Sequence, residues 1–170
     1  MKALFVIAPV DFRDEDYFVP KQILEGGGIE VITTSTVEVS TSKFGKRIEV
    51  DVLLENVDSN YEVIIFVGSH GARDYFDNQT ALNLARKFME GGKFVTAICI
   101  GPAILAKSGV LNDKMATVWA SSNNKEGVDI LEENGAKYVN QDVVIDEKVI
   151  TANGPEAAEE FGKKILEVLG

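Results

Sequence analysis

The sequence predicts a three-layer α/β domain, in which helices cover both faces of a doubly wound, mostly parallel sheet. Short apolar runs that suit β-strands alternate along the whole chain with longer amphipathic stretches. No linker rich in proline, glycine or serine interrupts this alternation. Because 170 residues are enough for one buried core and too few for two ordinary domains, we expect residues 1–170 to form a single domain.

The first part of the chain predicts two strands, one helix and one hairpin. Residues 3–8 are a continuous apolar run, which is typical of a strand buried on both faces. The helix expected at 16–25 ends at three consecutive glycines, and a second strand follows at 29–34. Residues 37–50 hold a Phe-Gly pair between alternating stretches, so we expect a β-hairpin outside the main sheet.

The middle of the chain repeats the order of strand and helix twice. A buried strand is expected at 63–67, followed by a helix at 80–90 that has apolar residues along one side and ends at two glycines. The next strand is expected at 94–98 and the next helix at 101–108. Cys99 therefore lies at a turn from strand to helix.

The last part of the chain completes the sheet. We expect a short strand at 116–118, a helix at 125–134 and a pair of strands at 143–145 and 149–151. A final helix is expected at 155–169, because proline is favoured in the first turn of a helix. This order of elements is the flavodoxin-like arrangement, in which ligands bind beyond the carboxyl ends of the strands.

The composition argues against several classes of partner. With 27 acidic and 17 basic residues the net charge is −10, so the phosphates of a nucleic acid would be repelled. The apolar opening lacks a small-residue cleavage site, and no run is long enough to span a membrane. We therefore expect a cytoplasmic protein without a membrane partner. One histidine and one cysteine are too few for a closed zinc site, and we expect neither metal nor cofactor.

Unusual residues follow three of the expected strands. The acidic segment 11–16 follows the first strand, Gly-Ser-His-Gly at 68–71 follows the strand at 63–67, and Cys-Ile-Gly-Pro at 99–102 follows the strand at 94–98. Neighbouring parallel strands bring their carboxyl ends to the same edge of a sheet. We therefore expect these three segments to form one site.

Cys99 is the residue that we expect to carry the chemistry. The positive end of the following helix would lower the pKa of its thiol and favour the thiolate. The backbone N–H groups of Ile100 and Ser69 would form an oxyanion hole. The small loop residues, among them Gly68 and Gly71, leave room for a substrate carbonyl to approach.

Each of these residues also has an ordinary structural interpretation. Free cysteine is among the most buried residue types, so Cys99 could be a small core residue. His70 on its own is more often a hydrogen-bonded loop residue than a general base. The acidic segment 11–16 is most simply the solvated first turn of a helix, where negative charge is favourable. A carboxylate turned inward would be the exception.

Four segments resemble the intracellular protease I (PfpI) superfamily, which includes the parkinsonism-associated deglycase proteins and has the class I glutamine amidotransferase-like fold. They are DFRDEDYFVP, FVGSHGARD, AICIGPAILAKSGVL and VVIDEKVITANGPEAAEEFGKKILEVL, and they extend over nearly the whole chain. The resemblance implies that Cys99 is a reactive nucleophile-elbow cysteine. It also implies that Asp16, four residues before Pro20, contacts the sulfur, although the family usually has glutamate there. Finally, it implies a homo-oligomer, a dimer or a larger ring.

The sequence departs from the family at the histidines. Members described as proteases or amidases have histidine directly after the cysteine, where this chain has Ile100. At the position of the acidic residue in the family's Cys-His-acid triad, this chain has Arg73. Deglycase-like members use a histidine farther along the chain, and this chain has Val118 at that position. No Cys-His-acid triad is inherited, although His70 follows a neighbouring strand and could substitute. Peptidase activity is therefore the least supported implication.

Three functions stay open at this point. The first is a cysteine-dependent hydrolase, glyoxalase or deglycase that acts on small reactive carbonyl or amide groups through Cys99, with Asp16 and His70 as further catalytic residues. The second is a non-catalytic sensor of oxidative stress, in which Cys99 oxidises to a sulfinate held by Asp16 and the helix terminus. The third is a chaperone-like oligomer with an inert thiol.

Overall fold

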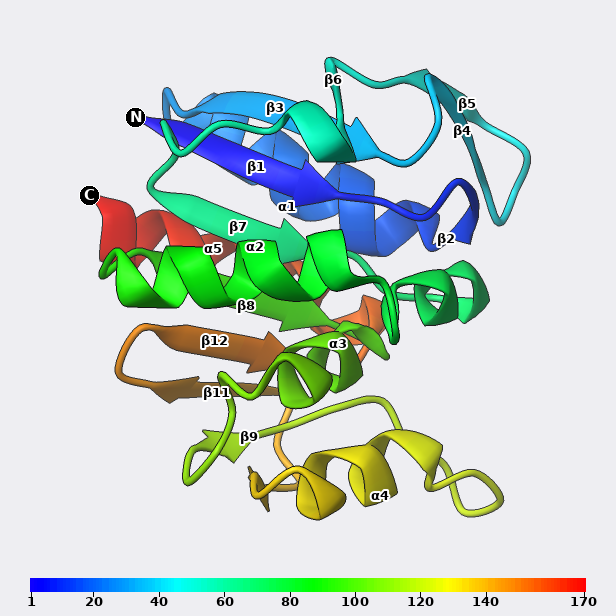
Figure 1. The fold of residues 1–170 in the computed structure, drawn as a ribbon, viewed down its shortest axis with the longest axis vertical. Helices are drawn as coiled ribbons and strands as arrows, with labels where there is room; N and C mark the ends of the chain where they lie inside the picture. Colours follow the sequence, from blue (N-terminus) through cyan, green and yellow to red (C-terminus); the bar gives the residue numbers. More distant parts are fainter.

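A seven-stranded sheet forms the centre of the computed structural model, which describes residues 1–170 (Figure 1). Its strands are β1 (Lys2–Val6), β3 (Glu30–Ser35), β6 (Val52–Leu53), β7 (Val63–Phe66), β8 (Phe94–Ile98), β11 (Val143–Asp146) and β12 (Val149–Ala152). The strand order is β11-β12-β8-β7-β1-β3-β6, and every neighbouring pair is parallel except β11 and β12. The predicted parallel sheet is confirmed, and β1, β7 and β8 lie side by side within it.

Helices cover both faces of this sheet. They are α1 (Asp14–Gly26), α2 (Gln79–Glu90), α3 (Gly101–Ser108), α4 (Glu126–Glu133) and α5 (Ala158–Leu169), with 3-10 turns at Leu54–Asn56, His70–Tyr75 and Pro155–Ala157. Helices α1 and α5 pack together on one face, whereas α2 and α3 pack on the other, and α4 packs against α3 (Figure 1). The three-layer prediction is confirmed. None of the helices is both long enough and apolar enough to cross a membrane.

Two small sheets lie outside the main one. Strands β4 (Val39–Ser42) and β5 (Arg47–Glu49) form the predicted antiparallel hairpin. The hairpin is extended by β2 (Val10–Phe12), which pairs with β4 and was not predicted. Strand β9 (Met115–Ala116) pairs only with β10 (Lys137–Tyr138), so the strand expected at 116–118 does not join the main sheet.

The two largest differences in helix boundaries lie at N-termini. Helix α1 begins at Asp14, two residues earlier than expected, because Arg13 keeps an extended conformation and the three acidic residues after it all fit the first turn. Pro155 begins a 3-10 turn, and the α-helix itself begins at Ala158. The earlier start of α1 makes Asp16 the third residue of the helix, where the boundary expected from the sequence had made it the first.

Candidate active site around Cys99

Cys99 occupies the turn between β8 and α3 in a strained conformation. Its φ angle is 63°, a left-handed value that non-glycine residues rarely adopt. The backbone is fixed on both sides, because the Cys99 N–H donates to the Ala152 carbonyl at 3.0 Å and the Trp119 N–H donates to the Cys99 carbonyl at 2.8 Å. Such strain persists only where the surrounding structure holds it. The predicted position of Cys99 at a strand-to-helix turn is therefore confirmed.

Two glycines let the neighbouring loops approach the elbow. A Cβ atom on Gly68 would lie 2.4 Å from the Cβ of Cys99, and a Cβ on Gly71 would lie 1.8 Å from the Val10 carbonyl oxygen. No side chain fits at such distances, so close backbone contact requires glycine at both positions. The Arg13 N–H donates to the Gly68 carbonyl at 3.0 Å, which attaches the start of α1 to the same point. The three segments therefore meet, as their strand order predicts.

Within the acidic segment 11–16, Asp16 has the carboxylate that turns inward, because its side chain is completely buried. Neither of its carboxyl oxygens has a hydrogen-bond partner of good geometry. Burial therefore raises the pKa of Asp16 to about 8, although the Arg13 charge and the neighbouring Cys99 thiol partly oppose the rise. Near neutral pH the carboxyl group can hold a proton next to the sulfur.

The Cys99 thiol is less acidic than the sequence led us to expect. Burial and the neighbouring Asp16 carboxylate raise the pKa of Cys99 to about 12, whereas the helix terminus alone led us to expect a lowered value. The backbone N–H groups of Ile100 and Ser69 and the charge of Arg13 oppose the rise. Because the carboxyl and the thiol influence each other, they titrate as a coupled pair. The two N–H groups face the sulfur in the resting structure, and their use as an oxyanion hole stays a prediction.

Ser69 is a second strained residue at the site. Its φ angle is 110°, and that of Asp11 is 59°. The Ser69 hydroxyl donates to Oδ1 of Asp11 at 3.0 Å, which joins the two strained loops. Positive φ in a non-glycine residue costs of order 1–3 kcal/mol. Asp11, Ser69 and Cys99 therefore concentrate strain in the loops that meet at the site.

His70 belongs to the site but is not hydrogen-bonded to Cys99. Its ring is exposed, and its Nδ1 accepts from Nη1 of Arg73 at 3.4 Å. Arg73 is itself held by Glu126, with Nη2 to Oε2 at 2.6 Å and Nε to Oε1 at 3.2 Å. When Nδ1 accepts from arginine, the proton of a neutral imidazole lies on Nε2. His70 therefore offers an N–H donor, and no Cys-His pair of the protease kind is formed.

An open cavity of about 280 Å³ gives access to the sulfur. Cys99, Ser69, His70 and Ile100 all line it, as predicted from the sequence. The lining residues that sequence reasoning missed are Arg13, Lys43, Arg73, Asn124 and Pro155, and Trp119 adds an aromatic wall. Arg13 lies within the segment DFRDEDYFVP, which the resemblance to the family had already identified. No local sequence signal identifies Lys43, because the fold of the hairpin brings it to the cavity.

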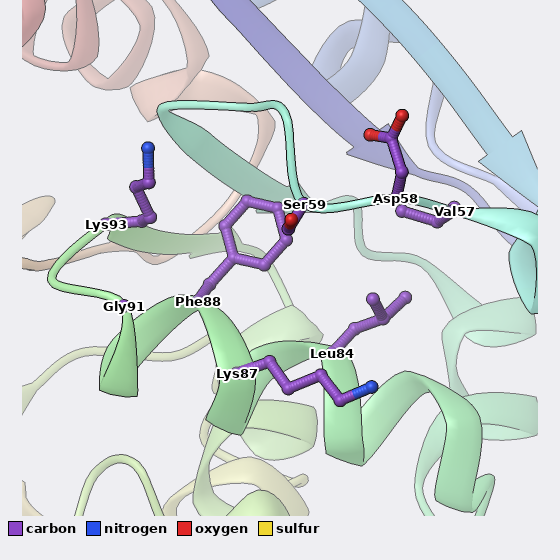
Figure 2. Close-up of a pocket in the computed structure, with 8 residues that line it drawn as sticks. All are labelled: Val57, Asp58, Ser59, Leu84, Lys87, Phe88, Gly91 and Lys93. Atoms are coloured by element: carbon purple, nitrogen blue, oxygen red, sulfur yellow. The ribbon is translucent and has the colours of Figure 1, made fainter.

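A second cavity, of about 340 Å³, is larger than the one at Cys99, and Cys99 is not among the residues that line it (Figure 2). Leu84 and Phe88 of α2 lie opposite the loop formed by residues 57–59, and Lys93 is at its edge, just before β8. Cys99 follows the other end of the same strand. No cysteine lines this cavity, and none of the predicted site residues does. Nowhere in the chain do three or more His, Cys, Asp or Glu side chains gather as metal ligands.

Comparisons with known proteins agree on one family. The family model described as DJ-1/PfpI matches residues 1–168. The glutathione-independent glyoxalase DJR-1.2 of Caenorhabditis elegans is 31% identical over 98% of this chain and 88% of its own length. The deglycase PfpI of Pyrococcus furiosus is 29% identical over 91% of each protein. A ThiJ/PfpI domain protein of Brachyspira murdochii has a crystal structure with a TM-score of 0.92, at 27% identity over 99% of this chain and 95% of its own. The matches extend over the whole fold and include the cysteine elbow, and the chain therefore belongs to the DJ-1/PfpI family.

Proposed function

We propose that this protein is a cysteine-dependent enzyme that converts small reactive carbonyl compounds, as a glyoxalase or deglycase, with Cys99 as the nucleophile. The observation that supports this proposal best is the strained Cys99 elbow beside the buried Asp16 carboxyl group, at an open cavity. A glyoxalase and a deglycase stand among its relatives, which agrees with the same chemistry.

Methylglyoxal illustrates the steps that the site would perform. The thiol proton passes to Asp16, and the sulfur forms a bond to the aldehyde carbon while the carbonyl electron pair moves to oxygen, which takes up a proton. The aldehyde C–H proton is then removed and returned to the neighbouring carbon, which gives a thioester of lactate. Water cleaves the thioester, releases lactate and restores the thiol. The redox change is internal to the substrate, so no external oxidant or reductant is needed.

The remaining site residues have separate proposed tasks. Asp16 accepts and returns the proton, because its raised pKa lets it change protonation near neutral pH. The N–H groups of Ser69 and Ile100, together with Nε2–H of His70, would donate to the developing oxyanion. Peptidase activity is not proposed. Ile100 occupies the position of the histidine that would protonate an amine leaving group, and His70 has no hydrogen bond to the sulfur.

Lactate formation from methylglyoxal tests this function. We expect turnover by the natural chain and its loss in Cys99→Ser, with unchanged unfolding transitions showing that the variant is folded. Asp16→Asn should lower kcat at least tenfold, because general acid-base catalysis contributes a factor of 10² or more. His70→Asn, which keeps a side-chain donor, should retain more activity than His70→Ala. Equal turnover by the natural chain and Cys99→Ser would refute the proposal.

A second candidate, oxidation of Cys99 to a sulfinate, is favoured by the protonatable Asp16 carboxyl group beside the sulfur. Two molecules of hydrogen peroxide would each transfer one oxygen to the thiolate and leave as water. The carboxyl group could then donate to a sulfinate oxygen. A mass gain of two oxygens at Cys99 before any at Met89 or Met115 would support this function. Preferential oxidation of the methionines would exclude it. The homo-oligomer implied by the family resemblance stays a prediction.

A further inference from the structure

The cavity at Cys99 has a charge opposite to that of the whole chain. Three cationic side chains line it, those of Arg13, Lys43 and Arg73, and none of the lining residues is Asp or Glu. Yet the chain carries 27 acidic and only 17 basic residues. A cleft lined with one sign of charge concentrates ligands of the other sign. The composition of the lining therefore favours an anionic ligand.

The three cations differ in how far they are already neutralised. Arg13 is paired with Glu15 at 2.7 Å, and Arg73 is paired with Glu126 at 2.6 Å. Lys43 forms no ion pair within the chain, although it reaches the same cavity. One unpaired ammonium group matches a single negative charge, such as that of a carboxylate.

The hairpin that carries Lys43 is fixed to the site by its backbone. The Lys43 N–H donates to the Phe12 carbonyl at 2.8 Å. The next residue, Phe44, donates its N–H to Oδ1 of the buried Asp14 at 3.1 Å. Arg13 lies over the Phe44 ring, 5.3 Å from its centroid. The position of the lysine at the cavity is therefore built into the fold.

We propose that Lys43, assisted by the two arginines, binds the carboxylate of a small oxo-carboxylate whose carbonyl carbon meets Cys99. This inference rests on the proposed carbonyl chemistry and names its substrate class. The ammonium group holds the carboxylate at the rim, and the carbonyl next to it points to the sulfur. A neutral aldehyde of the same size lacks this interaction and binds more weakly.

Alkylation of Cys99 tests the preference for an anion without requiring turnover. Iodoacetate and iodoacetamide are similar in size, and in both the sulfur displaces iodide, which leaves with the C–I electron pair. The ratio of the iodoacetate rate to the iodoacetamide rate should fall roughly two- to fivefold in Lys43→Gln, the range expected for one partly exposed ion pair. Lys43→Arg should keep the ratio. Lys46→Gln is the matched control, because Lys46 carries the same charge on the same hairpin but lies over the Phe18 ring and outside the cavity.

Protection experiments then identify the anion. Glyoxylate should protect Cys99 from iodoacetamide at a lower concentration than methylglyoxal does, and this advantage should shrink roughly two- to fivefold in Lys43→Gln. Better protection by glycolaldehyde phosphate than by glyoxylate would overturn the choice of a carboxylate. Equal alkylation ratios in Lys43→Gln and Lys46→Gln would overturn the anion site itself. Loss of methylglyoxal turnover with an intact alkylation ratio would instead reject only the catalytic proposal.

Discussion

Replacement of Asp16 by asparagine should remove a loss of stability that the natural chain undergoes as the pH rises to 8. The pKa of this carboxyl rises from its ordinary value of 3.8 to about 8 in the fold, a difference of about 4 units. The folded state therefore binds a proton that the unfolded state has released between these values, and stability falls as the pH rises from about 4 to about 8. At about 1.4 kcal/mol per unit, and allowing for the partial titration at both ends of the range, the loss between pH 5 and pH 8 is about 4 kcal/mol.

Urea unfolding of the natural chain and of Asp16→Asn at several pH values between 5 and 8 measures this loss. The difference in free energy of unfolding between the two proteins should grow by about 4 kcal/mol across this range, because asparagine does not titrate. Cys99→Ala is the control, since Asp16 stays buried in that variant and the pH dependence should persist. Parallel pH profiles of the natural chain and Asp16→Asn would show that the buried carboxyl keeps an ordinary pKa, and the reasoning on the site would fail.

Two further predictions concern the elbow. The midpoint of Cys99 alkylation by iodoacetamide should lie above the free-cysteine value of about 8.5 and should fall in Asp16→Asn, because the carboxylate raises the pKa of the thiol. A midpoint below 8.5 in the natural chain would contradict this, and so would a midpoint that rises in the variant. Gly68→Ala should destabilise the fold by about 1–3 kcal/mol, because the new Cβ meets the Cys99 Cβ at 2.4 Å and the Ile98 carbonyl oxygen at 2.6 Å. Gly26→Ala, with nothing within 4 Å, is the matched control in urea unfolding, and equal effects at the two glycines would contradict the close-contact argument.

The sequence predicts the main sheet because its strands are long apolar runs whose burial follows from their composition. It fails at strands of two or three residues, such as β2, β6 and β10, since their pairing depends on neighbours brought close by the fold. The meeting of the three loops at Cys99 was predictable, because strand order alone decides it. The arrival of Lys43 was not, because it requires the hairpin contact with Asp14.

The direction in which the pKa of the Cys99 thiol shifts also depends on tertiary contacts that the sequence does not reveal. A helix terminus can be recognised in the sequence and lowers the pKa of a nearby thiol. Burial of Cys99 and the inward turn of Asp16 belong to tertiary structure, and together they outweigh the helix terminus. The prediction of a lowered thiol pKa was therefore wrong in sign.

The raised pKa values do not argue against a reactive thiol, because they describe a coupled pair that can share one proton rather than two independent groups. The high pKa of Cys99 reflects in part an Asp16 that is already charged. If the proton moves from sulfur to carboxyl, this repulsion disappears and the N–H groups of Ile100 and Ser69 face a thiolate beside a neutral acid. Such a transfer leaves the net charge of the site unchanged, so it needs no high external pH. Asp16 lowers the stability of the fold at neutral pH, and in return the thiolate can form next to the carbonyl that it attacks.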